Sequence, residues 1–350
     1  MENSEPLKPS LKGLGIRRKE IRLSQEVLVK ADCLSADCCL PLVVQPAIEG
    51  LELIGWAKSN RDFIETKLRN HGAILFRNFN VKTISEFEQF IIAVSGELLA
   101  YSYRSTPRSQ VSGKIYTSTE YPAYQSIPLH NEMSYSRDWP LKIWFFSIKR
   151  AEQGGETPIA DSRRVFARID PKIRERFIQK NVMYVRNYRK ELDLSWQNVF
   201  QTTSRAEVEE YCRKVGIEFE WMNGDRLRTR QLCQAVAAHP KTGEMVWFNQ
   251  AHLFHISSLN SEIRDTLISD FSEEDLPRNT YYGDGSAIEN SVLDEIREVY
   301  QQEAVSFPWQ EGDVLMLDNM LTAHGREPYV GSRTVVVGMA EPFSNKEYLV

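Results

Sequence analysis

Residues 128–135 read Pro128-Leu-His130-Asn-Glu132-Met-Ser-Tyr, and this stretch bears most directly on the fold. Pro128 and the lack of helical periodicity favour an extended backbone, in which residues two apart point to the same side. His130 and Glu132 could then offer an imidazole nitrogen and a carboxylate oxygen to one metal ion. On a helix the same spacing would splay the two side chains. The stretch therefore predicts a strand that carries two metal ligands.

A third ligand is available much later, in residues 312–328, which read GDVLMLDNMLTAHGREP. An apolar strand expected at 314–318 leads into the polar pair Asp318-Asn319 and then to His324. Two histidines and one carboxylate on one face of an octahedral ion leave three positions open, which is typical of non-haem Fe(II) oxygenases. The Asp-Asn pair could orient the ligands or simply form a turn.

An anion-binding pair of residues accompanies these ligands. Arg333 opens the apolar strand expected at 334–340, where a guanidinium is either exposed at the strand end or buried against an anion. Arginine binds carboxylates bidentately, and this pairing is strongest in a dry pocket. Thr157, in the glycine-rich stretch 154–158, could add a hydroxyl to the same carboxylate.

The composition limits the classes of function. The chain has 350 residues, of which 42% are hydrophobic and 26% charged, and its net charge of −5 argues against a nucleic-acid partner. No apolar run approaches the roughly 18 residues of a membrane span. No apolar segment follows the N-terminus as in a secretory signal, so we expect a cytoplasmic protein without a membrane partner. The five cysteines are interpreted as free thiols, because a chain of this size needs no disulfide staple.

Only six histidines are present, so an imidazole-based metal site has few sources. His252 and His255 are three apart and could share a helix face, but they lack a matched carboxylate. We expect these two in a pocket wall or behind the ligands. His71 and His239 are interpreted as structural.

The pattern of hydrophobic residues predicts short strands with inserted helices. Expected strands are 141–148, 182–188, 217–221, 226–236, 245–249, 304–307, 314–318 and 334–340, and expected helices are 171–180, 206–215, 261–271 and 287–302. A helix–strand–helix unit at 49–70, 73–76 and 83–94 precedes them. This arrangement favours a barrel or jelly roll over a doubly wound parallel sheet. We predict an N-terminal extension at 1–48 and one catalytic domain at 49–350.

These motifs resemble the TauD/TfdA superfamily of Fe(II)- and 2-oxoglutarate-dependent dioxygenases, and most closely its subgroup similar to the syringomycin-biosynthesis enzyme. The resemblance spans roughly residues 70–341. The segments that carry it begin at His130, Gly154, His239 and Tyr282 and end with Asp318-Asn319 through His324-Gly-Arg326. It implies a mainly β fold with helices, built on a double-stranded β-helix (a cupin-like jelly roll) with N-terminal and inserted helices.

The resemblance also implies the site residues. His130, Glu132 and His324 would bind Fe(II), and Thr157 and Arg333 would hold the far carboxylate of 2-oxoglutarate. No catalytic residue beyond the metal ligands is expected. A glutamate ligand argues against halogenation, which needs the carboxylate position vacant for halide. Val337 stands four residues past Arg333, where the taurine enzyme has a second arginine, so a sulfonated substrate is not expected.

The implied reaction consumes 2-oxoglutarate and O2, releases succinate and CO2, and hydroxylates an unactivated C–H bond. The implied substrate is an amino acid or amino-acid derivative, free or bound to a carrier protein, in natural-product biosynthesis. One alternative keeps these cofactors but ends in desaturation, epoxidation or cyclisation. Another is a non-catalytic jelly-roll binding module. A homo-oligomer is left open.

Five residues are candidates for contacts with this small-molecule substrate: Arg104, Glu120, Asn131, Asn249 and Gln250. Arg104 could hold a carboxylate and Glu120 an ammonium group. Asn131 lies between the two ligands of the first motif and could also orient them. Asn249 and Gln250 end a stretch that resembles a pocket wall in the subgroup, although a buried strand would look the same.

Overall fold

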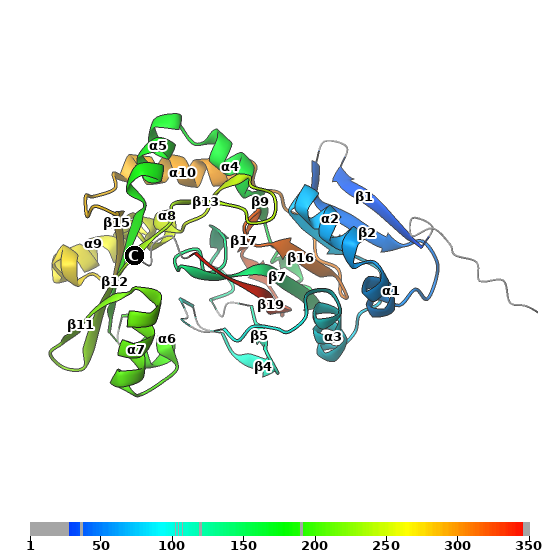
Figure 1. The fold of residues 1–350 in the computed structure, drawn as a ribbon, viewed down its shortest axis with the longest axis horizontal. Helices are drawn as coiled ribbons and strands as arrows, with labels where there is room; N and C mark the ends of the chain where they lie inside the picture. The colour runs from blue at the N-terminus through cyan, green and yellow to red at the C-terminus, as the bar shows by residue number, and fades with distance from the viewer. Residues whose placement is uncertain are drawn as a thin grey trace, which may run out of the picture.

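The computed structural model describes residues 28–35, 38–101, 103, 105–106, 108–118, 121–189 and 192–345. Its main sheet has eight strands in the order β1-β2-β3-β16-β7-β19-β5-β4 (Figure 1). In that order they span Val29–Ser35, Cys38–Pro46, Ala73–Phe76, Val314–Asp318, Asp138–Lys149, Thr334–Ser344, Ile115–Thr117 and Gln110–Ser112. All neighbouring pairs are antiparallel except β2 and β3, which are parallel.

A smaller sheet carries the metal-binding motifs. Its strands are β6 (Ile127–His130), β17 (Thr322–Arg326) and β9 (Ile159–Asp161), in the order β6-β17-β9. The register of β6 and β17 pairs His130 with His324. Beside it, β8 (Gln153–Gly154) pairs with β18 (Tyr329–Val330).

The main sheet is buried on both faces because successive side chains of a strand point to opposite sides. On β16, Val314 and Met316 pack in the cluster beneath helices α1 (Leu53–Ser59), α2 (Arg61–His71) and α3 (Ile84–Ser95). Leu315 and Leu317 point the other way and pack with Ile159 of the smaller sheet. The two sheets therefore enclose a core between them.

The segment between β9 and β16 adds a third layer. It forms a four-stranded antiparallel sheet in the order β11-β12-β10-β15, spanning Glu218–Met222, Arg226–Cys233, Val182–Tyr188 and Arg278–Tyr282. Its other elements are α4 (Ser162–Arg168), α5 (Pro171–Lys180), α6 (Trp196–Phe200), α7 (Arg205–Val215), β13 (Val236–Ala238), β14 (Met245–Trp247), α8 (Ala251–Phe254), two short 3-10 helices, η2 (Ile256–Ser258) and η3 (Glu273–Asp275), α9 (Ser261–Asp270) and α10 (Asn290–Glu303). In Figure 1 this sheet, with α6 and α7, lies at the end of the molecule opposite β1, β2 and α1.

The predicted fold class is confirmed: the chain is mainly β, with a jelly-roll core and inserted helices. Two local predictions are wrong. The helix expected at 49–70 is two helices, because Asn60 adopts a non-helical conformation and its amide donates to the Trp56 carbonyl at 2.7 Å. The strand expected at 304–307 is a single bridge between Val305 and Ile159.

The N-terminal part of the chain is joined to the main sheet. Within the range predicted as an extension, β2 pairs in parallel with β3, which lies in the predicted domain. The prediction of free thiols is wrong for Cys33 and Cys39, which form a disulfide between β1 and β2. Pairing of neighbouring strands brings the two thiols together, a contact that chain size does not predict. Cys212 and Cys233 are free and buried, as predicted.

Among the described residues, no helix combines the length and the apolar character needed to cross a lipid bilayer.

Candidate active site

His130, Glu132 and His324 come together between the two sheets of the jelly roll. Each offers one ligand atom, and these atoms lie within 4.8 Å of one another. The centroids of the two imidazole rings are 4.5 Å apart, and His324 Nε2 is 3.9 Å from Glu132 Oε2. In the part of the chain that the structure describes, this is the only such group of three possible ligands.

The predicted strand carries only one of its two ligands. His130 ends β6, whereas Glu132 lies in the following turn, where Met133 has a φ of 58°. The expectation that both residues share an extended face is therefore wrong, although the turn still brings the carboxylate beside His130. The chain leaves the sheet directly after His130, so Glu132 is no longer part of an extended strand.

The protonation states of the two histidines suit a cation. Burial lowers the pKa of His130, and burial together with neighbouring His130 and Arg108 holds the pKa of His324 well below its usual value. Both rings are then neutral near pH 7, as metal ligation requires. His130 Nδ1 lies 2.8 Å from the Pro128 carbonyl, which accepts a hydrogen bond from the Nδ1–H group. The unprotonated Nε2 is then left to bind a metal. The donor set fits Fe(II).

Arg108 contacts the triad, a contact that its position in the sequence does not predict. Its Nη2 donates to Glu132 Oε2 at 2.6 Å, and both side chains are buried. A carboxylate has about four lone-pair sites, so Glu132 can accept from Arg108 and still ligate a metal. In the sequence, Arg108 stands in a polar loop and gives no local signal of burial.

Asn319 fixes the backbone of Glu132. Its Oδ1 accepts from the Glu132 amide at 2.7 Å, and its Nδ2 donates to the carbonyls of Glu132 and Pro140, each at 2.9 Å. Every polar atom of this buried amide group is used. The structure therefore gives Asn319 the orienting contact that the sequence allowed as one of two interpretations.

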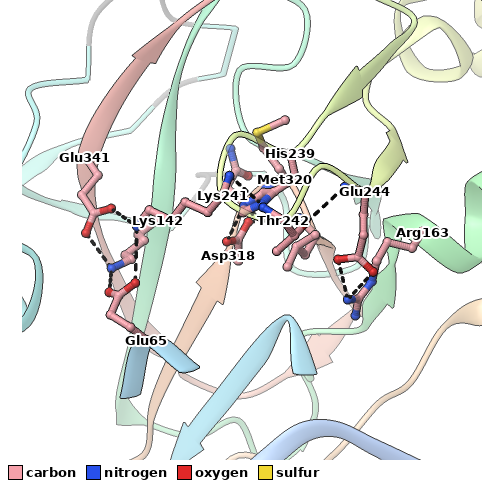
Figure 2. A network of polar contacts seen from close by, with 12 residues as sticks. Glu65, Lys142, Arg163, His239, Lys241, Thr242, Glu244, Asp318, Met320 and Glu341 are labelled. Atoms are coloured by element: carbon pink, nitrogen blue, oxygen red, sulfur yellow. Dashed lines mark hydrogen bonds and ion pairs between the residues drawn. The ribbon is translucent and has the colours of Figure 1, made fainter. Parts of the chain in front are cut away.

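Asp318 holds the turn that presents Asn319. Its Oδ1 accepts from the amides of Met320 and Leu321, and its Oδ2 lies 3.0 Å from His239 Nε2 (Figure 2). The structural role predicted for His239 is thus a contact to this turn. His239 Nδ1 in turn accepts from the Thr242 amide at 3.1 Å.

A buried lysine stands beside this turn on the neighbouring strand. Lys142 of β7 pairs in register with Asp318, and its ammonium contacts Glu65 and also Glu341 at 2.6 Å. Lys241 bridges the same two carboxylates at 3.3 and 3.4 Å, as Figure 2 shows. Four charges from α2, β7, β19 and the 239–244 turn are therefore paired where these elements meet.

A small cavity of about 30 Å³ opens on one side of the triad. Its lining residues are Arg108, Ser118, Ile127, His130, Phe145, Thr157, His324, Gly325, Arg326 and Arg333. Three guanidinium groups are present, and none of the described lining residues is acidic. We call this the cosubstrate cavity, because its excess of positive charge suits an anionic group such as a carboxylate.

Arg333 and Thr157 lie in this cavity as a pair. Arg333 Nε donates to the Gly155 carbonyl at 2.8 Å. Burial, and then the neighbouring Arg326, lower the pKa of Arg333 to about 10, so it remains a cation at neutral pH. Gly155 has a φ of 75°, and a Cβ there would lie 2.9 Å from Arg333 Cδ, which explains why glycine stands at this position.

A much larger cavity of about 620 Å³ opens on the other side of the triad. We call it the substrate cavity. His130 and Glu132 of the triad line this cavity, and so do Arg108, Gln250 and His255. Further lining residues are apolar: Ile127, Pro128, Leu192, Leu253, Phe254, Ile256, Leu259, Ile263, Leu267 and Pro277.

A second ion pair lines the substrate cavity. Arg278 Nε donates to Asp193 Oδ2 at 2.9 Å and its Nη2 donates to Asp193 Oδ1 at 2.6 Å. Burial would raise the pKa of Asp193, but the attraction of Arg278 and Arg186 and hydrogen bonds hold it below its usual value. Neither residue was predicted, because 85 residues separate them in the sequence.

Of the predicted substrate residues that the structure describes, only Gln250 lines a cavity. Gln250 lines the substrate cavity, and its Nε2 donates to the Asn131 carbonyl at 2.8 Å. Asn131 and Asn249 line neither cavity: the Asn131 amide donates to Ser162 and to the Asn319 carbonyl, and the Asn249 amide donates to the Ala235 carbonyl. Their polar groups support the backbone near the site. Arg104 and Glu120 lie outside the described residues.

The rival histidine pair does not form a metal site among the described residues. His252 is buried, its Nε2 lies 3.1 Å from the Leu129 carbonyl, and its ring stacks on Tyr300. His255 lines the substrate cavity. These positions agree with the expected place behind the ligands and in a pocket wall.

Residues 41–339 match the family described as "Taurine catabolism dioxygenase TauD, TfdA family". The dapdiamide synthesis protein DdaC of Enterobacter agglomerans is 43% identical over 279 residues, which cover 80% of this chain and 85% of that protein. A clavaminate synthase-like protein of Arabidopsis thaliana is 27% identical over 294 residues, covering 81% of this chain and 86% of that protein.

Among solved structures, PvcB of Pseudomonas aeruginosa is similar in fold. It is described as an Fe, alpha-ketoglutarate dependent oxygenase from an isonitrile synthetic pathway. The TM-score is 0.52 at 13% sequence identity, over 89% of this chain and 90% of PvcB. This likeness concerns the fold alone.

The family match and the 43% identical relative cover most of the chain, and the triad fits the family's metal. The predicted family and the cofactors Fe(II), 2-oxoglutarate and O2 are therefore confirmed, which leaves no support for a non-catalytic binding module. The chain belongs to the TauD/TfdA family of Fe(II)- and 2-oxoglutarate-dependent dioxygenases.

Proposed function

We propose that this dioxygenase hydroxylates an unactivated C–H bond of an amino acid or amino-acid derivative in natural-product biosynthesis. His130, Glu132 and His324 hold Fe(II), and Thr157 and Arg333 hold the far carboxylate of 2-oxoglutarate. The relative DdaC takes part in dapdiamide synthesis, which supports the pathway class. The proposal keeps three expectations from the sequence: a cytoplasmic location, a possible carrier-bound form of the substrate, and room for a homo-oligomer.

The position of the triad between the two cavities carries this proposal. His130, Arg108 and Ile127 line both cavities, while Thr157 and Arg333 line only the smaller one. A metal held by the triad would therefore face the cosubstrate on one side and the substrate on the other. This is the juxtaposition that coupled oxidation of two molecules requires.

The chain's own residues bind, orient and exclude water. Bound Fe(II), with 2-oxoglutarate and O2, supplies the oxidising chemistry. Arg333 and Thr157 give the cosubstrate one orientation, and Asn319 keeps Glu132 in place for the metal. Phe145 packs 5.1 Å from the His324 ring and keeps that side of the triad dry.

The substrate cavity supports an amino-acid-like substrate. Arg108 and Arg278 offer partners for an anion, and Asp193 offers one for a cation. Apolar side chains from α8, η2 and α9 fill part of the wall and suit a hydrocarbon portion. Desaturation, epoxidation and cyclisation would use the same residues, so the product distinguishes them.

The assignment of the metal ligands is tested by spectroscopy without turnover. We expect anaerobic Fe(II) and 2-oxoglutarate to give a visible charge-transfer band in the wild-type protein and no band in His324→Ala. Arg333→Ala should raise the 2-oxoglutarate concentration needed for the band far more than the Fe(II) concentration. Equal effects on both requirements would show that Arg333 is not the carboxylate anchor.

The substrate class is tested by a screen for succinate release. Free amino acids, their acylated derivatives and carrier-bound forms are compared under identical conditions, and the product is analysed by mass spectrometry and NMR. We expect one class to stimulate succinate release with the gain of a hydroxyl group. A product that has lost two hydrogens or gained an epoxide would show that the enzyme carries out one of the alternative reactions instead of hydroxylation.

A further inference from the structure

A tryptophan behind the cosubstrate cavity contacts one of the proposed anchors. The Nε1 of Trp309 donates to Thr157 Oγ1 at 3.1 Å, and both side chains are buried. Thr157 lines the cosubstrate cavity, whereas Trp309 does not. The indole therefore contacts the threonine hydroxyl without itself lining the cavity.

The backbone around Trp309 is held in place from both sides. Val305 and Ile159 exchange two backbone hydrogen bonds, at 2.8 and 2.9 Å, so the segment that leads to Trp309 runs beside the one that follows Thr157. Arg77 donates to the Pro308 carbonyl at 2.8 Å and pairs with Asp313. The indole ring has little freedom to leave the threonine.

This contact decides which way the hydroxyl proton points. An indole N–H can only donate, and a threonine hydroxyl has one proton to give. Because Thr157 accepts from Trp309, its own proton is directed away from the indole. No other hydrogen bond of this hydroxyl is recorded among the described residues, so the proton remains available on the cavity side.

We propose that Trp309 is a positioning residue that fixes Thr157 as a hydrogen-bond donor to the far carboxylate of 2-oxoglutarate. A carboxylate only accepts hydrogen bonds, so a hydroxyl that is already oriented to donate binds it without first having to rotate. This inference rests on the anchor role proposed above for Thr157.

Four other buried tryptophans show that the fold does not require such a pairing, although Trp196 and Trp221 also donate their indole N–H groups. The buried Nε1 atoms of Trp56, Trp139, Trp144 and Trp247 have no hydrogen-bond partner among the described residues. The fold thus tolerates unpaired indole N–H groups at several buried positions. At Trp309 the N–H instead meets a hydroxyl that lines a ligand cavity.

The test measures 2-oxoglutarate binding to the Fe(II) protein under anaerobic conditions, with iron saturating. A charge-assisted hydrogen bond contributes about 1.5–3 kcal/mol, so Thr157→Val should raise the Kd for 2-oxoglutarate at least about tenfold. Trp309→Phe keeps an aromatic ring but removes the N–H, and should raise this Kd about three- to tenfold, with the Fe(II) affinity unchanged. The double variant should bind like Thr157→Val alone, because the indole acts only through the hydroxyl.

Two controls make the result specific. Trp247→Phe changes a buried indole with no recorded partner and should leave the 2-oxoglutarate Kd unchanged. The analogue 2-oxopentanoate has a methyl group in place of the far carboxylate, so its affinity should be the same in wild type, Thr157→Val and Trp309→Phe. Additive effects in the double variant, or equal weakening of 2-oxopentanoate, would overturn the proposal.

A second measurement does not depend on folding of Trp309→Phe. In 15N-tryptophan-labelled, Zn(II)-loaded protein, one indole N–H signal should shift in Thr157→Val and should also respond to 2-oxoglutarate but not to 2-oxopentanoate. If no indole signal changes in Thr157→Val, the hydrogen bond is absent and the inference fails. If Thr157→Val binds 2-oxoglutarate normally, the anchor role in the proposed function fails instead.

Discussion

At the scale of single residues, several groups of the site are held by partners distant in the sequence. Asn319 holds the Glu132 backbone, Arg108 contacts the Glu132 carboxylate, and Trp309 contacts Thr157. Such partners decide the orientation of a ligand once the residue type has decided its chemistry. The site therefore depends on contacts made by residues that never touch the metal.

Asn319→Ala is expected to weaken Fe(II) binding by about 10- to 100-fold, the usual cost of losing an orienting partner. The variant removes three hydrogen bonds, two of which clamp Glu132. Titration of the apoprotein with Fe(II) under anaerobic conditions measures the effect. Asn60→Ala is the matched control, since its buried side-chain amide donates to the Trp56 carbonyl of α1 and lines neither cavity. Unchanged Fe(II) affinity in Asn319→Ala would show that these hydrogen bonds do not position Glu132 for the metal.

At the scale of elements, strand pairing positions the two histidines of the triad and a turn positions the glutamate. The β6–β17 register places His130 opposite His324, and the turn after β6 supplies Glu132. α9 differs from the other long helices because none of its residues is buried. Its Ile263 and Leu267, four apart and so on one face, line the substrate cavity, so α9 is a part of the wall that buries no residue in the core.

The helix α8 gives the protein a sensitivity to acid. Burial, followed by Arg297 and His130, lowers the pKa of His252 to about 3. The unfolded chain binds a proton at this residue below about pH 6.5, whereas the folded chain does not until pH falls to about 3. Stability from this residue is therefore complete above pH 6.5 and is lost progressively on acidification.

We expect the free energy of unfolding to fall as pH is lowered from 6.5 to 4, with His252 contributing a slope of up to about 1.4 kcal/mol per pH unit. His252→Phe keeps a ring to stack on Tyr300 but cannot be protonated, so its slope should be smaller. Urea unfolding at a series of pH values measures both slopes. An identical slope in the variant would mean that His252 is protonated in the folded protein.

At the scale of the whole molecule, three layers build one site. The jelly roll presents the triad and the cosubstrate cavity, and the inserted segment between β9 and β16 supplies Asp193, Gln250, Phe254 and Arg278 to the substrate cavity. The metal site and the substrate wall thus belong to different parts of the chain. Substrate choice can vary with the inserted segment while the triad stays the same.

Because ligands bind the folded chain, metal and cosubstrate should stabilise the molecule together. A ligand at one hundred times its Kd adds about 2.7 kcal/mol to the free energy of unfolding. We expect Fe(II) with 2-oxoglutarate, added anaerobically, to raise the Tm, and a chelator to reverse the rise. In His324→Ala the rise should be absent. A rise of the same size in that variant would show that the ions bind elsewhere.

Much of the fold could be predicted because local patterns survive folding. The strands at 182–188 and 314–318 and the helix at 171–180 follow directly from the pattern of hydrophobic residues. The break at Asn60 and the disulfide between Cys33 and Cys39 were missed, because each depends on a partner that local propensity does not specify. For the same reason, the contacts of Asn131 and Asn249 with distant backbone carbonyls could not be predicted from the sequence.

Residue types and the family resemblance were enough to predict the chemistry of this protein: two imidazoles and one carboxylate for Fe(II), and a threonine and an arginine for 2-oxoglutarate. How those groups are held and what faces them depends on the tertiary structure. The Arg108–Glu132 and Trp309–Thr157 contacts join residues 24 and 152 positions apart, and Arg278 meets Asp193 across 85. Such contacts form only when the sheets and the inserted layer pack together, because packing, not local propensity, brings distant side chains within hydrogen-bond distance.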